Sequence, residues 1–82
     1  MFTKINLKHC SSEKYGVYTT ISAAQNACSA DSNCKGVYDQ GCDAGANDIY
    51  LCPVTATYQT SGSSCIYEKI GKIKIFDNIL RE

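Results

Sequence analysis

The stretch Asn26–Gly45, NACSADSNCKGVYDQGCDAG, holds three of the six cysteines of an 82-residue chain, at Cys28, Cys34 and Cys42. Cysteines this close together can bind a metal ion, carry out redox chemistry or join elements of structure by disulfide bonds. Which of these roles the cysteines have matters for the fold, because a chain of this length is only marginally stable from its hydrophobic core alone.

The spacing of the cysteines favours disulfides over a zinc or redox site. Structural zinc sites and thiol redox centres commonly use a Cys-x-x-Cys pair, and the sequence contains none. The single histidine, His9, is adjacent to Cys10, and neighbouring residues of a strand point to opposite faces. The cysteine count is even, and about 7% cysteine is close to the content of disulfide scaffolds. The spacing leaves the pairing open among the many connectivities that six cysteines allow.

Composition and charge exclude several classes of protein. The chain has 8 basic and 8 acidic residues and no continuous basic run, which argues against nucleic-acid binding. No apolar run approaches the length of a membrane span. Met1 is followed at once by a polar, strand-like segment rather than a secretory signal, so we expect a mature or excised fragment, forming one domain over residues 1–82.

The first segment, residues 2–10, alternates as a half-buried strand does. Ile5 and Leu7 are expected on the buried face, with lysines on the other. Cys10 has the same parity as the lysines, so a bend or bulge near the strand end is needed to turn it toward the core. A turn and a short strand over residues 17–20 are expected to follow.

A helix is predicted over residues 19–31. Ser22 and Gln25 have the spacing of a capping box, and Thr20 is a competing N-cap. Ile21, Ala24 and Cys28 recur at helical spacing and form the predicted buried stripe.

The second half is predicted to be β-structure. Two polar connections, residues 40–48 and 53–64, separate short strands expected at residues 34–39, 49–52, 65–69 and 72–76. Strands on either side of a single helix predict an α+β domain, with the helix on one face of an antiparallel sheet.

Four motifs carry a resemblance to a known family: SAAQNAC (22–28), DSNCKGVYD (31–39), YLC (50–52) and SCIYEK (64–69). Together they resemble the PAN/apple family of cysteine-rich extracellular modules over Leu7–Lys69, with a domain core of about residues 5–70 and a strand or tail beyond. The resemblance implies a small disulfide-rich fold, a twisted antiparallel sheet cradling one helix. It also implies a nested disulfide pairing: Cys10–Cys65, Cys28–Cys52 and Cys34–Cys42.

Residues for catalysis or metal binding are not evident from the sequence. One histidine and scattered serines make no catalytic triad, so the domain is expected to be non-enzymatic, without a cofactor. Asp39, Asp43 and Asp48 suggest calcium, but they lack the EF-hand pattern. We therefore favour a solvated loop and expect no metal there.

Tyrosine and lysine are the remaining candidates for ligand binding. Tyr38, Tyr50 and Tyr67 lie in predicted strands and are expected to be buried or half-buried, whereas Tyr58 lies in a polar loop where packing has less claim on it. The candidate binding residues are Thr55, Thr57, Tyr58 and Gln59 in this loop, and Lys72 and Lys74. If a Cys10–Cys65 bond joined the chain ends, Lys4 and Lys8 would extend the lysines into one basic patch, although such lysines are usually a solvated sheet face.

The resemblance implies a secreted recognition or adhesion module that binds an extracellular protein or carbohydrate. The alternative is a structural extracellular-matrix protein in which disulfides and tyrosines provide durability.

Overall fold

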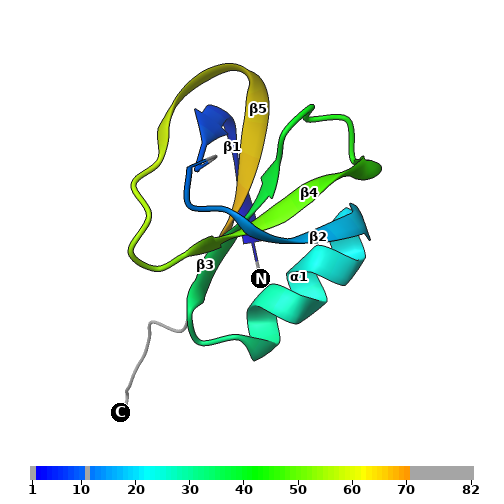
Figure 1. Ribbon diagram of the computed structural model, residues 1–82, viewed down its shortest axis with the longest axis vertical. Coiled ribbons are helices and arrows are strands. Elements are labelled where there is room, and N and C mark those ends of the chain that lie inside the picture. The colour runs from blue at the N-terminus through cyan, green and yellow to red at the C-terminus, as the bar shows by residue number, and fades with distance from the viewer. Residues whose placement is uncertain (1, 11, 71–82) are drawn as a thin grey trace.

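The computed structural model describes residues 2–10 and 12–70, with residues 45–47 described by their backbone alone. Within these residues one helix packs on a five-stranded antiparallel sheet of order β1-β5-β3-β4-β2 (Figure 1). The elements are β1 (Phe2–His9), β2 (Tyr15–Thr20), α1 (Ile21–Ala30), β3 (Cys34–Asp39), β4 (Gly45–Pro53) and β5 (Gln59–Lys69). This arrangement confirms the predicted helix and antiparallel sheet in a small disulfide-rich domain.

Strand β1 contains the bulge that Cys10 requires. Leu7 has a φ of 62°, and the pairing with β5 shifts between Asn6 and Lys8. Beyond the shift, Cys10 is buried, as expected. The prediction that Leu7 shares a buried face with Ile5 is wrong, because the left-handed backbone turns its side chain outward and leaves it 54% exposed.

Helix α1 begins one residue after Thr20, which is the N-cap. The Thr20 side chain accepts a hydrogen bond of 3.1 Å from the backbone N–H of Ala23, so the helix starts ahead of the alternative capping box at Ser22. Ala24 and Cys28 are buried and Ile21 is partly buried against the same cluster, which confirms the predicted stripe. The stripe packs on β2, β3 and β4 around a cluster of buried residues, Ala24, Cys28, Cys34, Val37, Ile49 and Leu51.

A second cluster of buried residues lies on the opposite face of the sheet. Val37 belongs to the helix-side cluster and its neighbour Tyr38 to this one, as the two-residue period of a strand requires. The opposite-face cluster comprises Cys10, Tyr38, Cys52, Ala56 and Ile66. Tyr38 is buried, and Tyr50 and Tyr67 are half-buried, as predicted.

Several strands are longer than predicted, and β2 begins at Tyr15 rather than at residue 17. Strand β4 begins at Gly45 and β5 at Gln59, inside segments that were expected to be polar connections. The added part of β5 pairs with β1, where Gln59 lies opposite His9 and Thr60 opposite Lys8. The strands pair through backbone hydrogen bonds, so polar residues can form part of the sheet although the sequence shows no alternation of apolar residues there. The strand predicted at residues 72–76 lies outside the described residues.

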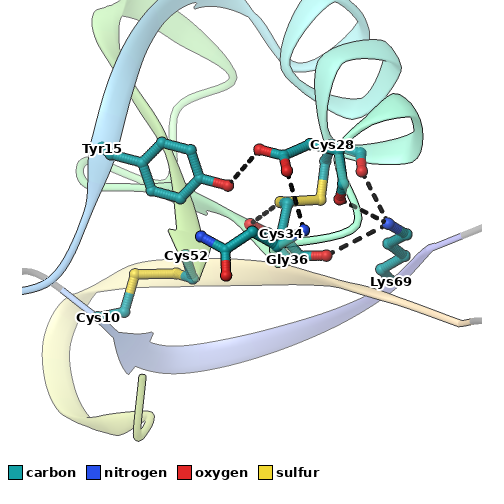
Figure 2. Close-up of a disulfide and its surroundings, with 9 residues drawn as sticks. Cys10, Tyr15, Cys28, Cys34, Gly36, Cys52 and Lys69 are labelled. Atoms are coloured by element: carbon teal, nitrogen blue, oxygen red, sulfur yellow. Dashed lines mark hydrogen bonds between the residues drawn. A yellow bond between two sulfur atoms is a disulfide. The ribbon is translucent and has the colours of Figure 1, made fainter. Parts of the chain in front are cut away.

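All six cysteines form disulfides, but the nested pairing is wrong. The bonds are Cys10–Cys52, Cys28–Cys34 and Cys42–Cys65, with Cα–Cα distances of 6.0, 5.2 and 5.3 Å. The first two appear in Figure 2.

The direction of each side chain explains the pairing. Leu51 faces the helix, so Cys52, the next residue of β4, faces away from Cys28 and meets Cys10 in the opposite-face cluster. Cys28 instead bonds to Cys34, which follows the helix after a tight turn. Cys65 lies on β5 beside Asp39, and the loop that follows Asp39 carries Cys42 to it.

Peptide mapping under non-reducing conditions should recover these three pairs. Cleavage before Asp31 and after Tyr18, Tyr38, Tyr50 and Tyr58 is needed, because it places each of the six cysteines on a peptide of its own. A fragment joining Cys28 to Cys52 would contradict the structure and restore the nested pairing.

Candidate functional site

The loop between β4 and β5, residues 54–58, is held to the sheet at several points. The backbone N–H of Val54 donates to the carbonyl of Asn33 at 2.8 Å, and that of Ala56 to the carbonyl of Pro53 at 3.0 Å. Lys35 Nζ donates to the carbonyl of Ala56, whose side chain is buried. With the Cys10–Cys52 bond at its start, the loop has a fixed backbone.

Tyr58 lies on the inner side of this loop. It packs against the opposite-face cluster, and Lys35 Nζ lies 4.4 Å from the centre of its ring. Its hydroxyl is buried and has no hydrogen-bond partner within the described part of the chain. Burial raises the pKa of Tyr58, and the nearby Glu68 charge adds to the effect. The expectation that Tyr58 is less involved in packing than the strand tyrosines is therefore wrong, because its side chain packs beneath the loop and supports it.

The other predicted loop residues point outward. Thr55, Thr57 and Gln59 are exposed, and Val54 beside them is 49% exposed. Three of the four predicted loop residues are therefore exposed, and we call Val54, Thr55, Thr57 and Gln59 together the 54–59 surface. Whether it binds a ligand stays a prediction.

The predicted basic patch lacks the bond that was expected to assemble it. Lys72 and Lys74 lie outside the described residues, and Cys65 bonds to Cys42 rather than to Cys10. Lys4 is exposed and lies with Nζ 5.8 Å from the centre of the Tyr67 ring, and Lys8 is half-buried. A lysine patch therefore stays a prediction without support from the disulfides.

Lys69 has a structural role that the sequence did not indicate. Its Nζ donates to the carbonyls of Cys28, Asp31 and Cys34 at 2.8, 3.2 and 3.3 Å, where helix α1 ends (Figure 2). Tyr15 donates to the Asp31 carboxylate at 2.6 Å, and this hydrogen bond is the main cause that lowers the pKa of Asp31. These contacts fasten β5 and β2 to the end of the helix.

The structure brings Asp39, Asp43 and Asp48 together. Each contributes one carboxylate oxygen to a group in which all three oxygens lie within 4.8 Å of one another. Asp43 is exposed, as a solvated loop requires, but Asp39 is completely buried, so the solvated-loop interpretation is wrong for Asp39. Of the described acidic residues, these three are the ones whose arrangement suits a metal ion.

Comparison with known proteins gives no relative: no protein-family model, curated protein or solved structure matches this chain. The helix present in the described residues is too short to cross a membrane. The described residues also enclose no pocket.

Proposed function

We propose that the chain is a non-enzymatic extracellular domain for recognition or adhesion, and that it binds protein or carbohydrate through the 54–59 surface. The proposal rests partly on the resemblance to PAN/apple modules, which serve this purpose. The three disulfides indicate an oxidising environment of the extracellular type, and secretion is part of the proposal.

The observation that carries the proposal is the contrast between the two sides of the loop. Its inner side is fixed by a disulfide, backbone hydrogen bonds and Tyr58, whereas Thr55 and Thr57 are exposed. A loop that is already ordered loses little conformational entropy when it binds, which favours recognition. Hydroxyl and amide groups next to an apolar side chain suit a carbohydrate or a polar protein surface.

Changing Thr55 and Thr57 together to alanine should weaken binding about tenfold or more, because about 1 kcal/mol is lost with each hydrogen bond. The oxidised protein would first be screened on arrays of glycans and extracellular proteins, and the ligand found would be titrated against the double variant. The Thr3→Ala, Thr19→Ala variant is the matched control, because both threonines are exposed on β1 and β2. Its binding should be unchanged.

The dependence of binding on salt concentration distinguishes the 54–59 surface from the lysines as the binding site. Binding through the 54–59 surface should depend little on ionic strength, whereas binding through lysines should fall steeply as salt rises. Loss of binding in Lys72→Ser, Lys74→Ser with full binding in the threonine variant would overturn the proposed surface. Tyr58→Ala is a poor test, because it removes the support of the loop along with any contact.

A further inference from the structure

The hairpin formed by β3 and β4 brings three carboxylates to one place. Asp39 ends β3, Asp48 lies in β4, and Asp43 lies in the loop between the strands. The backbone N–H of Gln40 donates to the carbonyl of Asp48 at 3.0 Å, which closes the hairpin beside the carboxylates. Gly41 packs directly against them, since a Cβ built there would lie 2.8 Å from Asp48 Oδ2 and 3.1 Å from an Asp43 oxygen.

A disulfide holds the hairpin loop in this position. Cys42 is adjacent to Asp43 and bonds to Cys65, which pairs with Asp39 across β3 and β5. The backbone N–H of Cys42 also donates to the carbonyl of Asp39 at 3.1 Å. The loop therefore cannot move away to separate the carboxylates without breaking these links.

Two of the carboxylate oxygens are buried and unpartnered. Asp39 is 0% exposed, and its Oδ2 accepts a hydrogen bond of 2.8 Å from the N–H of Ala44. Its Oδ1 has no hydrogen-bond partner within the part of the chain that the structure describes, and the same is true of Asp48 Oδ1. A buried carboxylate oxygen without a donor or a cation is costly, so two in one cluster point to a positively charged ligand.

The electrostatics of the cluster agree with this geometry. Burial raises the pKa of Asp48, and the charges of Asp43 and Asp39 raise it further. Three like charges this close repel one another, and a divalent cation between them would remove the repulsion. Asp43 is exposed, so an ion reaches the cluster directly from solvent.

We propose that Asp39, Asp43 and Asp48 form a calcium-binding site at the mouth of the β3–β4 hairpin. Calcium binds oxygen ligands at about 2.3–2.6 Å, so oxygens on opposite sides of the ion lie about 5 Å apart, which accommodates separations up to 4.8 Å. Magnesium binds at about 2.0–2.1 Å and demands near-ideal octahedral geometry, and zinc prefers nitrogen and sulfur. The site does not depend on the proposed recognition function.

Titration of the oxidised, chelator-treated protein with calcium chloride tests this site. Isothermal titration calorimetry should show one calcium ion per chain, with a dissociation constant of about 10⁻⁴–10⁻³ M, as in extracellular calcium modules. The melting temperature should rise with calcium, because the ion binds only the folded hairpin. Magnesium chloride should bind more weakly.

Three variants separate the site from a general effect of acidic residues. Asp43→Asn and Asp48→Asn each remove one negative ligand and should weaken calcium binding about tenfold or more. Glu13→Gln removes the same charge at an exposed position outside the cluster and should bind calcium as the wild type does. Each variant is compared with itself with and without calcium, so a change in its basal stability does not affect the result.

Three results would overturn the proposal. The first is neither binding heat nor a rise in melting temperature up to about 10 mM calcium, well above the expected dissociation constant. The second is equal calcium affinity in the wild type, Asp43→Asn and Asp48→Asn. The third is magnesium binding as tight as that of calcium, which would contradict the choice of ion.

Discussion

Changing Cys10 and Cys52 together to alanine should lower the free energy of unfolding by about 4 kcal/mol. This bond joins residues 42 apart in the sequence, so its loss releases the most chain entropy to the unfolded state. Both cysteines are buried in the opposite-face cluster, and the variant also loses packing there. Since small domains are stable by only about 5–15 kcal/mol, this loss removes from about a quarter to most of the total stability.

The other two disulfides provide matched controls for the effect of loop length. Cys42–Cys65 spans 23 residues and Cys28–Cys34 spans 6, so their double alanine variants should lose about 3 and about 2 kcal/mol. Urea unfolding of the three oxidised variants would measure the order. A larger loss in the Cys28–Cys34 variant than in the other two would contradict this order. It would mean that the disulfide, rather than the hydrogen bonds of Lys69 and Tyr15, holds the end of the helix.

Changing Gly36 to alanine should lower the free energy of unfolding by about 1–3 kcal/mol, the usual cost of an overpacked core. A Cβ at this position would lie 2.6 Å from the Tyr58 hydroxyl oxygen and 3.2 Å from the carbonyl oxygen of Tyr67. Gly36 is in the central strand β3, between β4 and β5, so the backbone has little room to shift.

Removing the Tyr58 hydroxyl should partly rescue the Gly36 variant. Tyr58→Phe alone should be neutral or slightly stabilising, because it deletes a buried hydroxyl that has no partner among the described residues. The double variant Gly36→Ala, Tyr58→Phe lacks the closest contact, so it should recover part of the lost stability. Urea unfolding would measure this recovery as a coupling energy between the two positions. Strictly additive losses would mean that the clash is with the Tyr67 carbonyl alone.

The strand and helix patterns could be predicted because they are local. The alternation in residues 2–10, the stripe of Ile21, Ala24 and Cys28, and the Thr20 cap each depend on residues a few positions apart. The parity of Cys10 even predicted a bulge, which the structure places at Leu7. The polar start of β5 was missed because its pairing with β1 uses backbone groups that leave no pattern in the sequence.

The candidate sites were less predictable, because their residues meet through the fold. Tyr58 lies in a polar segment, and nothing near it in the sequence shows that Gly36 leaves room for its hydroxyl. Asp39, Asp43 and Asp48 lack a calcium-loop spacing, and they converge because β3 and β4 pair antiparallel. The one signal in the sequence was the concentration of aspartates around a hairpin.

The disulfide pairing shows the same division. Six cysteines in a short chain indicated that disulfides stabilise the domain, because a core of this size is only marginally stable by itself. Which cysteines pair was decided by tertiary structure. The face on which each side chain lies depends on the register of the whole sheet, so Cys52, one residue beyond the helix-facing Leu51, could not reach Cys28. Sequence patterns set the elements and the number of bonds, whereas face and register are properties of the assembled sheet.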